Sequence, residues 1–277
     1  MEGGPMNRRR LSVSSWSLHQ TLGGMRVTEP GDSPNGFPTT HKSALPLLEL
    51  PRQVAHHGIE TLELCHFHLP STESEYLAQL REQLELNRIE LWSLLIDGGN
   101  LNGPQTKRDF EWICRWIEVA AELGARNTRV IAGQGPPTNE NLCASIKQLG
   151  RLADFASERG VRLMTENWFS TMGTPASVRR VLDELNGKVD LCLDFGNWSG
   201  MGKYSDFVSI AKYATSCHAR ADFGMSGLLD EGDFRRCLTL MAASDFHGPF
   251  TLIPSGRFDD EWVAINQSAR VARAFCE

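Results

Sequence analysis

The chain has 277 residues, of which 41% are hydrophobic, and a net charge of -6 at pH 7. Its length suits one α/β barrel of about 250 residues, and the excess of 34 acidic over 28 basic residues argues against a nucleic-acid-binding surface. No apolar run approaches the roughly 18 residues of a membrane span, and residues 11–17 are too polar for a signal-peptide core. We therefore expect a cytoplasmic protein without membrane association.

Strand-like apolar runs alternate with helical periodicity along the chain. Residues 1–10 are predicted to form a flexible leader and 11–277 one barrel domain, while the polar segment 22–43 has the length of a functional lid or a disordered insertion. Strands are predicted at 11–16, 59–65, 89–96, 128–132, 161–165, in the stretch 189–198, at 214–218 and at 248–253. Helices are predicted at 44–57, from 71 onward, at about 110–124, and at 138–159, 174–186, 203–213, 231–244 and 259–275.

Eight strand-then-helix units without a break in composition predict a single closed (β/α)8 TIM barrel. A doubly wound open sheet is the alternative. Such a sheet usually has a glycine-rich phosphate-binding turn after its first strand, whereas this chain continues with Ser14-Ser15-Trp16-Ser17. The barrel is therefore the favoured fold class.

Seven cysteines are scattered along the chain without a CxxC pair, so we expect free thiols in a reducing compartment. Cys192 and Cys217 lie in apolar runs, where a cysteine usually acts as a small hydrophobic residue.

Three polar side chains follow three successive predicted strands: Glu166, Asp194 and His218. Because the carboxyl ends of barrel strands meet at one rim, these side chains are expected to converge. Two carboxylates and an imidazole suit a divalent ion such as Mg²⁺, Mn²⁺ or Co²⁺. The structural alternatives are that Asp194 caps the next helix and that His218 is a hydrogen-bonded core residue. An unpaired buried carboxylate would cost several kcal/mol, which favours a functional role for Glu166.

Other polar and aromatic residues near the strand ends are candidates for substrate binding. An arginine can bind an anionic substrate group or act as a counter-ion for a carboxylate such as Glu166. Two histidines two positions apart point the same way if their strand continues through both. Tryptophans there can stack on a sugar ring or pack in the core. The candidates are Trp16, His66, His68, Arg129, Trp168, Asn197 and Arg220.

These motifs resemble the xylose isomerase-like barrel superfamily, which includes sugar phosphate isomerases and epimerases and the type IV AP endonucleases. The resemblance spans about 11–276 and rests on Thr165-Glu166-Asn167, Asp194-Phe195-Gly196-Asn197 and His218-Ala219-Arg220-Ala221-Asp222. It implies that Glu166, Asp194 and His218 hold a divalent ion, Mn²⁺, Mg²⁺, Co²⁺ or Zn²⁺. It also implies isomerase or epimerase chemistry on a hydroxy-carbonyl substrate through an enediolate, with Glu166 as general base.

Two positions depart from the family pattern. Asn197 stands where many members have histidine, and Ile253 stands where the resemblance implies a glutamate as fourth ligand and second base. Water, His66, His68 or Asp222 could replace that ligand, or the metal could be absent. A two-base epimerase is correspondingly disfavoured.

The leading prediction is a metal-assisted isomerase, epimerase or lyase acting on a small carbohydrate-like molecule, with no nucleic-acid partner. A barrel that binds a sugar or a partner without catalysis is the alternative, and Ile253 favours it. AP endonuclease activity is disfavoured, because strand eight offers no ligand for a zinc cluster and the net charge opposes a phosphate backbone. The sequence leaves open whether the protein forms a homo-oligomer.

Overall fold

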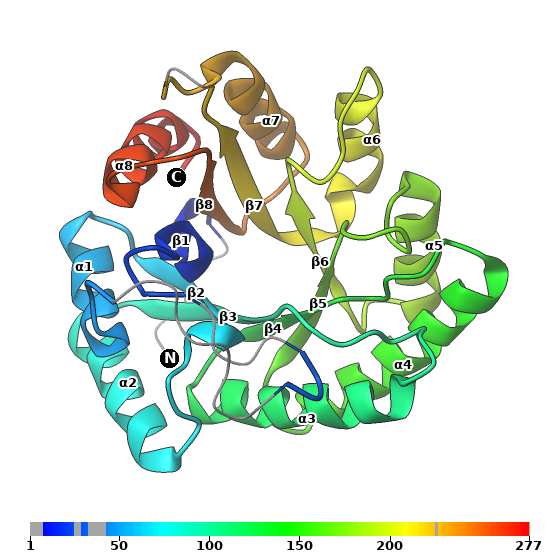
Figure 1. Cartoon of the computed structure of the whole chain (residues 1–277). Helices are drawn as coiled ribbons and strands as arrows, with labels where there is room; N and C mark the ends of the chain where they lie inside the picture. The colour runs from blue at the N-terminus through cyan, green and yellow to red at the C-terminus, as the bar shows by residue number, and fades with distance from the viewer. Residues whose placement is uncertain (1–7, 25–28, 33–42, 225–226, 277) are drawn as a thin grey trace, which may run out of the picture.

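The computed structural model describes residues 8–24, 29–32, 43–224 and 227–276. In this part of the chain, eight parallel strands close into a barrel in the order β1 to β8, and the helices surround it (Figure 1). The strands are β1 Arg10–Ser14, β2 Thr61–Cys65, β3 Glu90–Ile96, β4 Asn127–Val130, β5 Arg162–Glu166, β6 Asp190–Asp194, β7 Ala214–Asp222 and β8 Pro249–Ser255. The helices are α1 Leu50–His56, α2 Ser74–Leu86, α3 Thr106–Glu122, α4 Asn139–Ser157, α5 Pro175–Leu185, α6 Lys203–Ile210, α7 Glu231–Ala243 and α8 Glu261–Ala272. The predicted (β/α)8 fold is confirmed.

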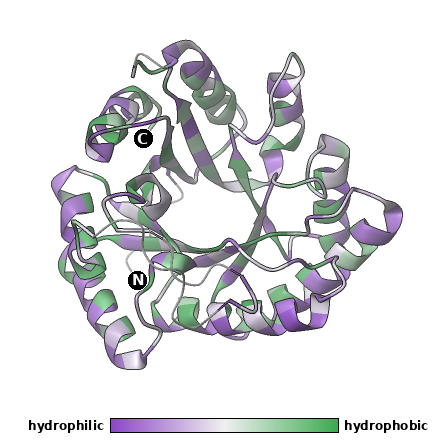
Figure 2. Ribbon diagram, viewed as in Figure 1, coloured by the Kyte–Doolittle hydropathy of each residue, from purple (hydrophilic) through white to green (hydrophobic). Residues whose placement is uncertain are grey.

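The helices pack on the barrel through apolar faces with helical spacing. In α3, Ile113, Ile117 and Ala120 are fully buried, as their three- and four-residue spacing predicts. Figure 2 shows hydrophobic residues on the barrel-facing sides of the helices and hydrophilic residues mainly on their outer sides. Burial of these faces supplies the main driving force for closing the barrel.

The inside of the barrel is polar near its carboxyl end. In register, Glu166 of β5 lies beside Cys192 of β6, and Asp194 lies beside His218 of β7. Since alternate strand residues point to opposite faces, Cys192 and Asp194 share the inner face. All four residues are buried. The register thus brings ionisable side chains together inside the barrel, where bulky aliphatic residues usually dominate.

The carboxyl ends of β2 and β7 both affect the site; β2 ends at its predicted residue, whereas β7 continues beyond its predicted end. β2 ends at Cys65 because His66–His68 form a 3-10 turn, so the two histidines do not continue the strand's alternation. β7 continues to Asp222, four residues beyond its predicted end, so Arg220 is a strand residue paired in register with Ile253 of β8.

The predicted leader and lid fall partly outside the described residues, namely at 1–7, 25–28 and 33–42. Within the described residues 29–32, Glu29 accepts a hydrogen bond of 2.9 Å from the backbone N–H of Gly99. This bond holds the segment against the loop after β3, on the face where the strands end. None of the helices in the described ranges is long and apolar enough to cross a membrane.

Candidate metal centre

Glu166 and Asp194, at the ends of β5 and β6, converge with His218 in the middle of β7, as the sequence predicts. The Nδ1 atom of His218 lies 3.5 Å from Glu166 Oε2 and 3.7 Å from Asp194 Oδ2. These distances exceed the 2.7–3.2 Å usual for a good hydrogen bond. They match the spacing of about 3.4 Å between ligands that surround one ion at bond lengths of about 2.1 Å. Each of the two separations is therefore the one expected between two ligands of a shared ion.

The opposite ring nitrogen of His218 is held by Glu63, a residue of β2 that sequence reasoning missed. His218 Nε2 lies 2.9 Å from Glu63 Oε2, and the hydroxyl of Ser216 donates to Glu63 Oε1 at 3.2 Å. Glu63 has no exposed surface. A carboxylate that accepts the Nε2 proton leaves the Nδ1 lone pair directed at the site, which is the usual support of a metal-binding histidine.

The charges of this region are unbalanced when His218 is neutral. The carboxylates of Glu63, Asp97, Glu166 and Asp194 are opposed by two guanidinium groups, those of Arg129 and Arg220. Burial by itself lowers the pKa of His218, but Cys192, Glu166 and Glu63 outweigh it and raise that pKa well above its ordinary value. The site therefore attracts positive charge, either as a proton on His218 or as a cation.

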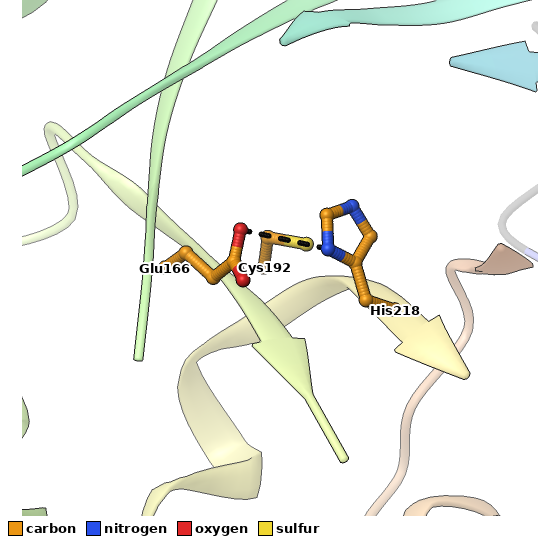
Figure 3. Close-up of side chains that lie close together, drawn as sticks. All are labelled: Glu166, Cys192 and His218. Carbon is orange, nitrogen blue, oxygen red and sulfur yellow. Dashed lines mark ion pairs between the residues drawn. The ribbon is translucent and has the colours of Figure 1, made fainter. Parts of the chain in front are cut away.

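A divalent ion fits the donor set. Glu166 Oε2 is buried, and among the described residues no donor completes a hydrogen bond to it. The described residues contain one compact group of candidate ligands, in which single atoms of Glu166, Cys192 and His218 lie within 4.8 Å of one another. Figure 3 shows the Cys192 side chain close to the Glu166 carboxylate and the His218 ring. Cys192 was expected to be a small hydrophobic residue, but it faces these polar groups.

Asp194 has features of both roles that the sequence left open, a cap of the following turn and a ligand of the centre. Its Oδ1 accepts hydrogen bonds from the backbone N–H groups of Gly196 and Asn197, at 2.6 and 3.0 Å, as in a capped turn. Its Oδ2 faces His218. Burial raises the pKa of Asp194, but the neighbouring His218 and the charge of Arg220 bring it below its usual value. One oxygen is thus fixed by the backbone and the other is directed at the centre.

Arg129 is a buried counter-ion. Its guanidinium contacts Asp97 at 2.5 Å and Glu166 Oε2 at 3.1 Å, and it lies 5.4 Å from the ring centre of Trp168. Of the two roles considered for Arg129, the geometry favours the counter-ion. Asn197 similarly donates to Glu166 Oε1 at 2.7 Å, so its amide holds the carboxylate in place.

A cavity of about 250 Å³ opens above these groups. The side chain of Arg220 passes close to Gly196, and a Cβ atom at residue 196 would lie 2.0 Å from the Cδ atom of Arg220. This close approach explains why residue 196 is a glycine. Ile253 contributes an apolar side chain where the resemblance implies glutamate. The lining residues include Trp16, Asp97, Arg129, Glu166, Trp168, Asp194, Asn197, His218, Arg220 and Ile253.

His66 and His68 do not line this cavity. His66 lies beneath α3 with its ring edge-on to those of Trp112 and Trp116. His68 Nδ1 lies 2.8 Å from the hydroxyl of Ser15, and burial, with His19, lowers the pKa of His68 to about 3. The 3-10 turn after β2 accounts for the difference, because the two histidines no longer follow the alternation of the strand. Their predicted contacts with substrate therefore gain no support.

Glu63 leads to a first prediction. Replacing Glu63 by glutamine keeps the shape of the side chain but removes the charge that fixes His218. We expect the affinity for a divalent ion to fall by about 10–100-fold, as measured by isothermal titration. Ser216→Ala removes only the second hydrogen bond to Glu63 and should have a smaller effect. Unchanged affinity in Glu63→Gln would show that Glu63 does not support the centre.

Comparison with known proteins agrees with the fold. Residues 51–273 match the model of the xylose isomerase-like TIM barrel family. The chain belongs to this family. No curated protein matches the sequence.

Solved structures with the same fold include several sugar epimerases. A D-allulose 3-epimerase from Methylomonas sp. in complex with D-allulose has a TM-score of 0.68 at 16% identity, covering 96% of this chain and 97% of that one. A 3-keto-D-glucoside 4-epimerase from E. coli has a TM-score of 0.64 at 17% identity, covering 84% and 97%. A xylose isomerase-like barrel protein from Mycobacterium smegmatis in complex with magnesium has a TM-score of 0.65 at 15% identity, covering 96% of both. At these identities the likeness concerns the fold.

Proposed function

We propose that this family member is a metal-assisted isomerase or epimerase that moves a proton on a small hydroxy-carbonyl sugar or a related compound. The observation that carries the proposal is the spacing of His218 Nδ1 from Glu166 Oε2 and Asp194 Oδ2 at 3.5 and 3.7 Å. Family membership and the sugar epimerases of the same fold support the substrate class. When bound, the ion would polarise the carbonyl and hydroxyl oxygens of the substrate.

Glu166 is the proposed base. It lines the cavity, and it is held by Asn197 on one oxygen and by Arg129 near the other. A carboxylate held in this way can accept a proton from the carbon next to a carbonyl and return it. Trp16 and Trp168 border the same cavity and can exclude water from the substrate.

The second base of a two-base epimerase is absent from its expected position. Ile253 is 5% exposed and borders the cavity, and the next residues of β8 are Pro254 and Ser255. Glu166 therefore has to remove and return the proton itself. This arrangement favours transfer on one face of the substrate, as in an aldose–ketose isomerase.

Solvent exchange tests the proposal. The protein, stripped of metal and then loaded with Mn²⁺, Co²⁺, Zn²⁺ or Mg²⁺, is incubated in D₂O with ketoses, aldoses, keto-glycosides, sugar acids and keto-cyclitols. In at least one class of substrate, we expect deuterium to be incorporated at the carbon next to the carbonyl, as monitored by NMR. This incorporation should be lost when the ion is removed. Absence of exchange from every class with loaded protein would contradict the proposed reaction.

Ile253 supports one competing proposal, a barrel that binds a sugar without turning it over. Thermal stabilisation by a sugar without any exchange would favour that reading. An endonuclease with a cluster of several zinc ions gains no support, because the described residues contain only one compact group of candidate ligands.

A further inference from the structure

Cys192 occupies a position that the proposed reaction does not use. It lies two residues before Asp194 on β6, beside Glu166 of β5 and Ser216 of β7 in the register, and it has no exposed surface. Its side chain therefore points into the barrel toward the carboxylates. Cys217, by contrast, precedes His218 on β7 and packs in the apolar core outside the barrel. Two equally buried cysteines on adjacent strands thus face opposite environments.

The sulfur lies within reach of an ion held by Glu166 and His218. One ligand atom of each of these residues and the sulfur of Cys192 lie within 4.8 Å of one another (Figure 3). Bonds to an ion measure about 2.3 Å from sulfur and about 2.0–2.2 Å from nitrogen or oxygen, so small side-chain rotations allow all three to bind it. Two of the three are already fixed, Glu166 by Asn197 and His218 by Glu63.

The opposite side of the centre lacks an anionic ligand. Ile253 offers only carbon atoms to the cavity at the end of β8. With Ile253 in place, an ion bound only by Glu166, Asp194 and His218 would have three protein ligands. In the described part of the chain, Cys192 is the further group whose ligand atom lies close to those of both Glu166 and His218.

We propose that Cys192 is a metal ligand that replaces the missing strand-eight carboxylate and makes the centre selective for Zn²⁺ or Co²⁺ over Mg²⁺. This inference rests on the proposed function only in requiring that an ion binds to Glu166 and His218. On binding, a bond forms between sulfur and metal, the S–H bond breaks, and the proton passes to solvent. Thiolate sulfur favours soft and borderline ions, whereas Mg²⁺ prefers an all-oxygen environment.

Cobalt absorption spectroscopy tests the inference on the folded, metal-stripped full chain. Titration with Co²⁺ should give a near-ultraviolet sulfur-to-cobalt charge-transfer band that saturates at one equivalent. Cys192→Ser should bind Co²⁺ without this band, whereas the matched control Cys217→Ser should retain it. Competition titrations should show that the preference for Zn²⁺ over Mg²⁺ falls by about tenfold or more in Cys192→Ser.

The outcomes separate this inference from the proposed function. Cobalt binding without the band in the wild-type protein would overturn the role of Cys192 and leave a metal-assisted reaction in place. Failure of any divalent ion to bind would overturn both. If Cys192→Ser does not fold, X-ray absorption of the zinc-loaded wild-type protein decides: a sulfur neighbour at about 2.3 Å supports the ligand, and a shell of nitrogen and oxygen alone overturns it.

Discussion

Replacing Glu166 by glutamine is expected to abolish turnover while leaving the barrel folded. The change removes both the proposed base and an anionic ligand, and general base catalysis alone contributes about 10²–10⁴-fold to a rate. The amide keeps the size of the carboxylate, and Arg129 keeps its contact with Asp97. We therefore expect loss of solvent exchange below detection, weaker metal binding by titration, and an almost unchanged circular dichroism spectrum.

Glu90→Gln provides the matched control for this variant. Glu90 begins β3 at the opposite end of the barrel, where it pairs with Arg10 at 2.5 Å. Its replacement removes one carboxylate from a strand without touching the centre, so exchange should continue at the wild-type rate. Full activity of Glu166→Gln on a substrate that the wild-type protein exchanges would remove Glu166 from the mechanism.

Replacing Arg129 is expected to have the largest effect on the stability of the fold. Its side chain is 3% exposed and is the shared counter-ion of Asp97 and Glu166. Replacing Arg129 by methionine leaves both carboxylates buried without that charge, and breaking such a pair typically costs about 3–5 kcal/mol. We expect a loss of this size in the free energy of unfolding, measured by urea denaturation of the metal-free protein.

Two further variants test the cause of that loss. Asp97→Asn in the Arg129→Met background removes one of the stranded charges and should recover part of the stability. Arg162→Met breaks a half-exposed pair with Asp190 at the other end of the barrel and should cost no more than about 1 kcal/mol. Equal effects of Arg129→Met and Arg162→Met would contradict the account of a buried counter-ion.

The fold could be predicted because its signals are local. Most strands contain a short apolar run, the helices repeat their apolar residues every three or four positions, and eight such pairs fit one barrel. The convergence of Glu166, Asp194 and His218 followed from the fold, since Glu166 and Asp194 end their strands and His218 lies beside Asp194 in the register. These residues could be found without knowing any contact between distant parts of the chain.

The rest of the site depends on contacts across the barrel that no local pattern encodes. Glu63 and His218 are 155 residues apart, and only closure of the barrel joins them. A glutamate within the apolar run of β2 was the available signal, because a charge there needs a buried partner. Cys192 looked like a core residue because the register, which decides which face it takes, is set by neighbouring strands.

The central claim is that one divalent ion binds between His218 Nδ1 and the Glu166 carboxylate. Anomalous diffraction from crystals of zinc-loaded or manganese-loaded protein tests it most directly. The account predicts a single strong peak within about 2.0–2.3 Å of both atoms, with Glu63 still bonded to the other nitrogen of His218. Loaded crystals without a peak at this position, or with the ion bound elsewhere, would contradict it.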